Sequence, residues 1–182
     1  EKSEVNGVNT CFNDLLIEDC VIENCVRAGI QMYTDHFYRD EWFPSENVVI
    51  RNNQLKFLRG DGIVVRGCNA PLIEYNTYLW GEDVGEAFAG MWAISCDDAL
   101  FQYNEVGYLT GAWDGYAFNA DDNSRRTCFQ YNYGHDCEGG FMLITHYDTE
   151  RPESECIGNS GATIRYNISE NCGKNNAEGP VF

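Results

Sequence analysis

Residues 100–104, Leu-Phe-Gln-Tyr-Asn, are followed 28 positions later by residues 128–132, Cys-Phe-Gln-Tyr-Asn. The same pattern, in which a hydrophobic pair leads to an Asn or Cys, begins four more times, at Leu16, Val49, Leu72 and Thr163. About ten residues after each copy a glycine opens a second apolar run, at Gly29, Gly62, Gly90, Gly115, Gly140 and Gly179. Self-similarity at such a period indicates a solenoid.

Each repeat contains two short strand-like runs, such as residues 48–50 and 63–65, and helix-length periodic stretches are absent from the sequence. A repeat of this kind, with 28 residues between the two quoted copies and two or three short strands, is the unit of a parallel β-helix. In that fold each strand pairs with its equivalent in the next coil. We therefore predict an all-β solenoid of about six coils that forms one domain over residues 1–182. Because Gly179 stands where a further strand would begin, we expect a segment of a longer helix, truncated at its C-terminal end.

Two columns of the repeat carry structural predictions. The aligned asparagines should stack at one bend with their amides bonded along the ladder, since Asn tolerates the left-handed backbone of a corner; they are Asn53, Asn76, Asn104, Asn132 and Asn167. In a second column Cys alternates with Leu and Gly, as a small buried residue would. We therefore predict free core thiols at Cys20, Cys25, Cys137 and Cys172, and the odd total of nine cysteines agrees with this.

Composition limits the classes of partner. A hydrophobic fraction of 43% with 14% aromatic residues excludes a disordered polymer. The net charge of -17 argues against nucleic acid and anionic membranes, because a phosphate-binding face needs clustered Lys and Arg. No apolar run in the sequence is long enough to cross a bilayer, so membrane insertion is not expected. Neutral or cationic partners fit better.

The strand after each glycine can be divided into faces, because side chains alternate with period two. Positions one and three after the glycine are almost wholly apolar, and at the fifth coil they place Phe141 and Leu143 inside. Positions two, four and six should then face outward; they include Trp92, Ala117, Met142, Arg66, Asn119, Ile144, Asp121 and His146. We expect the functional chemistry on this outer face.

Residues 114–122, Asp-Gly-Tyr-Ala-Phe-Asn-Ala-Asp-Asp, and residues 128–144, Cys-Phe-Gln-Tyr-Asn-Tyr-Gly-His-Asp-Cys-Glu-Gly-Gly-Phe-Met-Leu-Ile, carry a family resemblance. This stretch resembles the right-handed parallel β-helix proteins of the pectate-lyase-like superfamily, especially secreted bacterial proteins linked with polysaccharide breakdown. The resemblance implies a right-handed helix, a polysaccharide or oligosaccharide ligand and a secreted or cell-surface location. It does not fix the reaction, because the superfamily contains lyases, hydrolases, epimerases, esterases and noncatalytic adhesins.

The densest polar group lies in the fourth and fifth coils, and it suggests a paired-carboxylate glycoside hydrolase. Asp114 and Asp121 are the predicted catalytic pair, since such enzymes use one acid to protonate the glycosidic oxygen and a second to attack or to activate water. His146 follows Asp121 by one coil in the same column and is predicted to orient a carboxylate or bind a sugar hydroxyl. Each aspartate taken singly also fits a turn residue, as Asp61 does before Gly62.

Other residues are predicted to bind the substrate. Trp92 is the best candidate for stacking on a pyranose ring. Further polar contacts are expected from Asn119, Arg66, His135 and Asp122. No cofactor is required by this chemistry.

Three alternatives stay open. A calcium site could form from Asp121, Asp122 and Glu138, with Asp97 and Asp98 in the neighbouring coil. A polysaccharide lyase is disfavoured, because Arg66 is the only cation in the outward columns and the acidic chain would repel a polyanion. The third is a noncatalytic β-helix that binds glycan or serves as a surface or fibre spacer.

Overall fold

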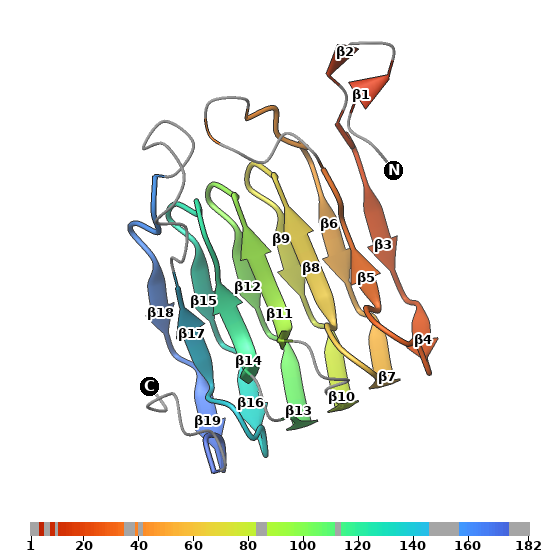
Figure 1. Ribbon diagram of the computed structural model, residues 1–182, viewed down its shortest axis with the longest axis vertical. Helices are drawn as coiled ribbons and strands as arrows, with labels where there is room; N and C mark the ends of the chain where they lie inside the picture. Colours follow the sequence, from red (N-terminus) through yellow and green to blue (C-terminus); the bar gives the residue numbers. More distant parts are fainter. Residues whose placement is uncertain are drawn as a thin grey trace.

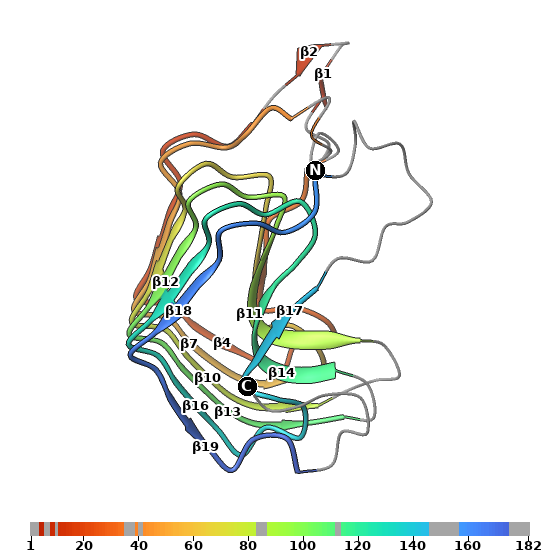
Figure 2. The same cartoon turned by 90° about the vertical axis from the view of Figure 1, so that its left-hand side faces the viewer.

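The computed structural model describes residues 4–5, 8–9, 11–34, 39, 42–82, 87–111, 114–145 and 157–174. Its coils stack into three parallel sheets, so the prediction of an all-β parallel β-helix is confirmed (Figures 1 and 2). A short antiparallel pair, β1 (Glu4–Val5) and β2 (Val8–Asn9), precedes the first coil. The described residues include no helix that is long and apolar enough to span a membrane.

Each sheet takes one strand from successive coils. The first sheet contains β3 (Leu16–Glu18), β6 (Val49–Arg51), β9 (Leu72–Glu74), β12 (Leu100–Gln102), β15 (Cys128–Gln130) and β18 (Thr163–Arg165). The second contains β4 (Val21–Glu23), β7 (Gln54–Leu58), β10 (Thr77–Glu82), β13 (Glu105–Thr110), β16 (Tyr133–His135) and β19 (Ile168–Glu170). The third contains β5 (Ile30–Gln31), β8 (Ile63–Arg66), β11 (Phe88–Ile94), β14 (Asp114–Ala120) and β17 (Met142–Ile144).

The predicted asparagine ladder is present at the corner between the first and second sheets. Asn104 Nδ2 donates to Asn132 Oδ1 at 3.0 Å and to the Ile73 carbonyl at 2.9 Å. Its own Oδ1 accepts from the backbone N–H and the Nδ2 of Asn76. The left-handed residue at this corner is the one before the asparagine, such as Tyr103 with φ 56°, so our reason for Asn there was wrong. Asn is needed because its amide replaces missing backbone partners.

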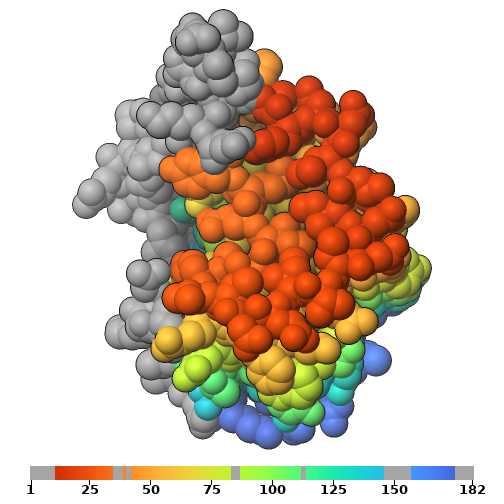
Figure 3. All heavy atoms as spheres, turned by 90° about the vertical axis from the view of Figure 1, so that its right-hand side faces the viewer, coloured from red at the N-terminus to blue at the C-terminus, as the bar shows by residue number. Residues whose placement is uncertain are grey.

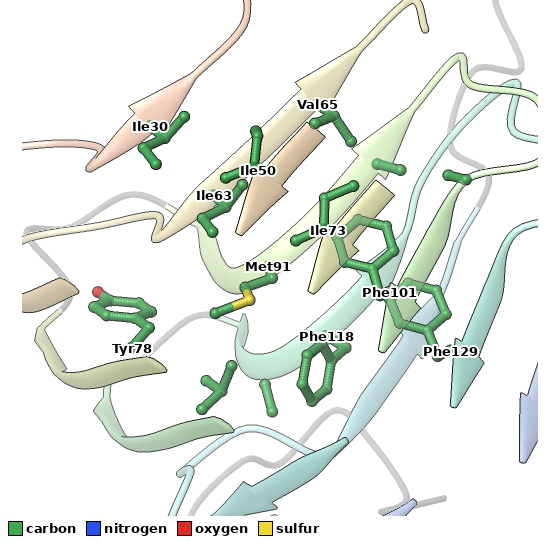
Figure 4. Close-up of a cluster of buried hydrophobic side chains, with 14 of the residues drawn as sticks. Ile30, Ile50, Ile63, Val65, Ile73, Tyr78, Met91, Phe101, Phe118 and Phe129 are labelled. Carbon is green, nitrogen blue, oxygen red and sulfur yellow. The ribbon is translucent and has the colours of Figure 1, made fainter. Parts of the chain in front are cut away.

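The side chains before the ladder also stack from coil to coil. Tyr75, Tyr103, Tyr131 and Tyr166 form a continuous row with ring centroids 4.9 to 5.2 Å apart. Inside the helix, Phe101 and Phe129 stack at 4.6 Å within the cluster of buried apolar side chains (Figure 4). Burying a large apolar side chain completely contributes about 1.5–3 kcal/mol, so these columns supply most of the stabilisation of each added coil.

The third sheet departs from the predicted register at the fourth coil. Met91 pairs with Ile63 on one side and with Phe118 on the other, so Ala117 and not Gly115 follows Gly62 and Gly90 in the corner column. A Cβ on Gly90 would lie 2.5 Å from the Ala117 carbonyl oxygen, which explains the glycine there. Ala117 was predicted to face outward, but it is buried in the core at this corner.

The predicted faces of the fifth coil are inverted over most of β17. Met142 pairs with Phe118 and is buried in the core, whereas Leu143 pairs with Asn119 and stays outside the core cluster. The prediction placed Met142 outside and Leu143 inside. Paired residues of the fourth and fifth coils are one residue closer in the sequence than predicted. A shift of one residue exchanges the two faces of a strand.

The eight described cysteines are free thiols, as predicted for Cys20, Cys25, Cys137 and Cys172. Cys137 lies in the core, and Cys25 and Cys172 pack against it. Cys20 is exposed, so the prediction that it is a core thiol was wrong. It follows β3 at the end of the solenoid that faces the viewer in Figure 3, where no described coil covers it.

Asn104→Ala should lower the free energy of unfolding by about 3 kcal/mol, because it removes four hydrogen bonds and leaves buried donors and acceptors unpaired. Asn167→Ala, at the half-buried last position of the ladder, should cost about 1 kcal/mol. Urea unfolding of the two variants measures both values. Equal losses would show that burial of the ladder does not set its strength.

Candidate active site

The outer face of β14 carries two of the predicted site residues. Phe118 and Ala120 belong to the core, so Asn119 and Asp121 between and after them face outward. Asn119 pairs with Trp92 on β11, which places these two side chains next to each other. The Asp121 N–H donates to the Ala93 carbonyl at 2.9 Å and continues the pairing past the end of the strand.

A β-bulge at the start of β14 positions Asp114. Phe88 pairs with Asp114 and Ala89 pairs with Tyr116, so Gly115 is an extra residue in this strand. Asp114 and Gly115 have φ values of 56° and 65°, and a bulge of this kind bends the strand and redirects its side chains. The two predicted catalytic aspartates thus lie at opposite ends of one bent strand.

Asp121 is the carboxyl group with the clearest functional electrostatics. Its pKa is raised to about 6, mainly by burial and to a smaller extent by the neighbouring carboxylates of Asp122 and Asp114. The Asp122 N–H donates to Asp121 Oδ1 at 2.7 Å. This hydrogen bond and the Arg66 guanidinium both lower the pKa of Asp121. The Asp114 carboxylate is therefore close enough to Asp121 to contribute to its raised pKa.

Arg66 reaches the site from the end of β8, two strands away from β14. It pairs with Ile94 on the intervening strand, and its guanidinium lies 5.3 Å from the centre of the Tyr33 ring. The Arg66 guanidinium is close enough to Asp121 to lower the pKa of that carboxyl group, and its role in binding substrate stays a prediction. Tyr33 was not predicted as part of the site.

Trp92 is held by a carboxylate that the sequence suggested only as a turn residue. Its Nε1–H donates to Asp61 Oδ1 at 2.8 Å, and the Ala89 N–H donates to the same oxygen at 3.1 Å. Asp61 is 1% exposed; burial raises its pKa, while these bonds and Arg27 at 3.4 Å lower it. Asp61 thus fixes the orientation of the Trp92 ring.

Residues far away in the sequence flank the end of β14. Arg39 donates to Asp97 Oδ1 at 2.7 Å and to the Asn123 carbonyl, and it stacks over Trp42 at 4.2 Å. On the other side Asn159 donates to the Ala120 and Asp121 carbonyls at 2.8 and 3.3 Å. The repeat pattern contained no signal for these contacts, because they come from segments between the strands.

Two predicted site residues lie elsewhere. His135 is on β16 in the second sheet, where its ring nitrogens contact Glu105 at 3.2 Å and Asp136 at 3.0 Å. Glu138 accepts the Gly111 N–H at 2.8 Å. The structure therefore does not bring His135 together with Asp121, because the two side chains face outward from different sheets. His146 lies outside the described residues.

The calcium hypothesis finds no cluster to support it in the described part of the chain. No group of three or more His, Cys, Asp or Glu side chains there could hold a metal ion, so Asp121, Asp122 and Glu138 do not form such a site. Asp97 accepts hydrogen bonds from Arg39 and Arg125, and the remaining candidate, Asp98, is bound by Arg126 at 2.7 Å. These last two aspartates hold coils and loops together.

The chain is similar in sequence and fold to parts of two glycan-cleaving enzymes. No family model matches the sequence. The chain is 32% identical to the lacto-N-biosidase of Bifidobacterium longum subsp. longum over 192 aligned positions, which cover 88% of this chain and 11% of that protein. It is also similar to the crystal structure of the GH136 lacto-N-biosidase from Eubacterium ramulus, with a TM-score of 0.75 and 28% identity over 92% of this chain and 29% of that one.

Asp121→Asn should stabilise the fold at pH 8 by about 3 kcal/mol, since the pKa of Asp121 is raised from 3.8 to about 6 and one pKa unit corresponds to about 1.4 kcal/mol. The raised pKa means that the folded protein binds the Asp121 proton more tightly than the unfolded chain, so wild-type stability falls as the pH rises from about 4 to 6. Below pH 4 the advantage of the variant should vanish. Urea unfolding at both pH values checks this; a pH-independent difference would contradict it.

Proposed function

We propose that this chain carries the catalytic carboxyl pair of a glycoside hydrolase of the lacto-N-biosidase type. The observation that carries the proposal is the placement of Asp114 and Asp121 at the two ends of the bent strand β14, where Asp114 contributes to a pKa of about 6 for Asp121. Similarity to two lacto-N-biosidases supports the same substrate class, a glycan that ends in lacto-N-biose. The chain spans about a tenth of the first protein and under a third of the second, so the activity is proposed for the whole protein that contains it.

The mechanism follows from the unequal ionisation of the pair. Near pH 6 the site can hold a proton on Asp121 while the second carboxyl group is ionised, because burial and the nearby carboxylates raise the pKa of Asp121. The protonated group donates to the glycosidic oxygen, and the bond to the anomeric carbon breaks as the leaving alcohol departs. The ionised group attacks that carbon or activates a water molecule. Arg66 keeps the pKa of Asp121 from rising out of the useful range.

Several further properties belong to the same proposal. Hydrolysis by a carboxyl pair needs no cofactor, and chelators should not reduce it. Trp92 and Asn119 would contact the sugar, since both lie on the outer face beside Asp121. A secreted or cell-surface location suits an extracellular glycan. Classification within the pectate-lyase-like superfamily is supported by the parallel β-helix.

Asp114→Asn and Asp121→Asn should each lower kcat on p-nitrophenyl β-lacto-N-bioside about a thousand-fold in the full-length protein, because each removes a group that transfers a proton or attacks. Asp98→Asn, an exposed aspartate bound to Arg126, is the matched control and should keep full activity. Added azide should rescue the variant that has lost its nucleophile and thereby assign the two roles. Glycan binding without cleavage by the wild-type protein would favour the noncatalytic alternative.

The pH dependence of kcat/KM should show loss of activity above about pH 6, as Asp121 loses its proton. Arg66→Met removes the cation that lowers the pKa of Asp121, so the alkaline limb should move to higher pH. A pH–rate profile of both proteins measures the shift. A limb that stays in place or moves down would show that Arg66 does not act on the titrating group.

A further inference from the structure

Two thiols lie next to each other where the fifth and sixth coils leave the second sheet. β16 and β19 pair in register, with His135 opposite Glu170 (Figure 1). Cys137 and Cys172 each follow two residues later in their own coil. The Gly173 N–H donates to the Cys137 carbonyl at 2.9 Å, so the pairing continues through both cysteines. Equivalent residues of adjacent coils have Cα atoms about 4.8 Å apart, within the range of about 4.4–6.8 Å that a disulfide spans.

The two cysteine side chains point in the same direction and contact each other. Each Sγ lies close to the carbonyl oxygen two residues earlier in its own coil, at 3.4 Å in the fifth coil and 3.6 Å in the sixth. A hydrogen bond from the Cys137 thiol lowers the pKa of Cys172, while the same contact and burial raise the pKa of Cys137. Cys172 is therefore the thiol that ionises first, and the thiolate is the form of cysteine that attacks disulfides.

This thiol pair can be reached from outside the core. Cys172 is half-buried, and a hollow of about 180 Å³ opens beside Cys137, lined also by Asn171 and Lys174. Reversible oxidation sites combine a cysteine of lowered pKa, contact with solvent and a second thiol close by. Cys172 has the first two properties, and Cys137 is the second thiol.

A second stacked pair of thiols in the chain lacks this access. Cys68 and Cys96 are equivalent residues of the second and third coils, and the Cys68 N–H donates to the Cys96 Sγ at 3.3 Å. Both side chains are fully buried, and the contact with Cys96 and burial raise the pKa of Cys68. Since both pairs are stacked, exposure to solvent is what distinguishes Cys172 from these two residues.

We propose that Cys137 and Cys172 form a modification site at which a small disulfide, such as oxidised glutathione, creates a protein disulfide between the fifth and sixth coils. The Cys172 thiolate attacks one sulfur of the small disulfide and releases the other half as a thiol. Cys137 then gives up its proton and attacks the Cys172 sulfur, which releases the second small thiol. Two protein thiols and one small disulfide thus become one protein disulfide and two small thiols.

This disulfide would hold the sixth coil at a point that its described strands do not reach. β18 and β19 attach the sixth coil in the first and second sheets. The disulfide would lie beyond β19, and cross-linking of this kind stabilises a fold by constraining the unfolded chain. The fifth coil also supplies β17, which pairs with β14, so the cross-link would support the strand between the two candidate catalytic aspartates.

The test treats the folded full-length protein with oxidised glutathione and maps its disulfides by peptide mass spectrometry. We expect one new bridge, between Cys137 and Cys172, which dithiothreitol reverses, while Cys68 and Cys96 stay reduced. Cys137→Ala should instead trap glutathione on Cys172, whereas Cys172→Ala should leave Cys137 unmodified. Circular dichroism checks that both variants fold. An unmodified Cys137 and Cys172 in the wild type, or equally fast bridging of Cys68 to Cys96, would overturn the inference.

Hydrogen exchange tests whether the disulfide holds the sixth coil in place. Peptides that contain β19 should exchange about tenfold more slowly in the oxidised than in the reduced wild type, because the cross-link limits local opening of this coil. Cys172→Ala, treated with glutathione in the same way, is the control and should show no slowing. Equal exchange in the oxidised and reduced wild type would contradict the inference. Both measurements are independent of glycan cleavage, so a failure of the proposed function leaves their outcome unchanged.

Discussion

The asparagine ladder is the constraint on which the rest of this structure depends. Each amide both donates and accepts across the gap between two coils, so the coils must stack at one spacing and in one register. A slip of one residue would break the ladder and turn every adjacent strand to its other face. The stacked tyrosines and the apolar columns of the core follow from this register, because equivalent residues are brought into line along the axis.

The sequence predicted those parts of the fold that repeat. Period, strand content and the ladder positions could be read because each coil meets the same physical demands as its neighbours. The prediction from the sequence failed where neighbouring coils differ from one another. Gly115 resembled the corner glycines but occupies a bulge, and Met142 changed face because the spacing to the next coil is one residue different. Cys20 resembled a buried column member but lies at an end of the stack.

The candidate site, like the fold, could be predicted only in part from the sequence. Asp114 and Asp121 stood out because they interrupt an apolar repeat, and the Asp114 carboxylate contributes to the raised pKa of Asp121. His135 was misplaced because nearness in sequence does not decide which sheet a side chain leaves. The supporting contacts of Asp61 and Arg39 could not be found, since they depend on segments between strands. Asp97 and Asp121 differ in the charged groups around them. Asp97 forms salt bridges with arginines, whereas neighbouring carboxylates help to raise the pKa of Asp121.

The candidate pair lies on one continuous segment, because Asp114 begins the bulged strand β14 and Asp121 directly follows its last residue. Their separation is therefore set by covalent geometry and one local bend, and not by how two distant elements pack. Heating loosens contacts between elements and at chain ends before it disrupts paired central strands. The pair should keep its geometry while the fourth coil stays in the stack, so thermal inactivation would coincide with cooperative loss of that coil rather than precede it.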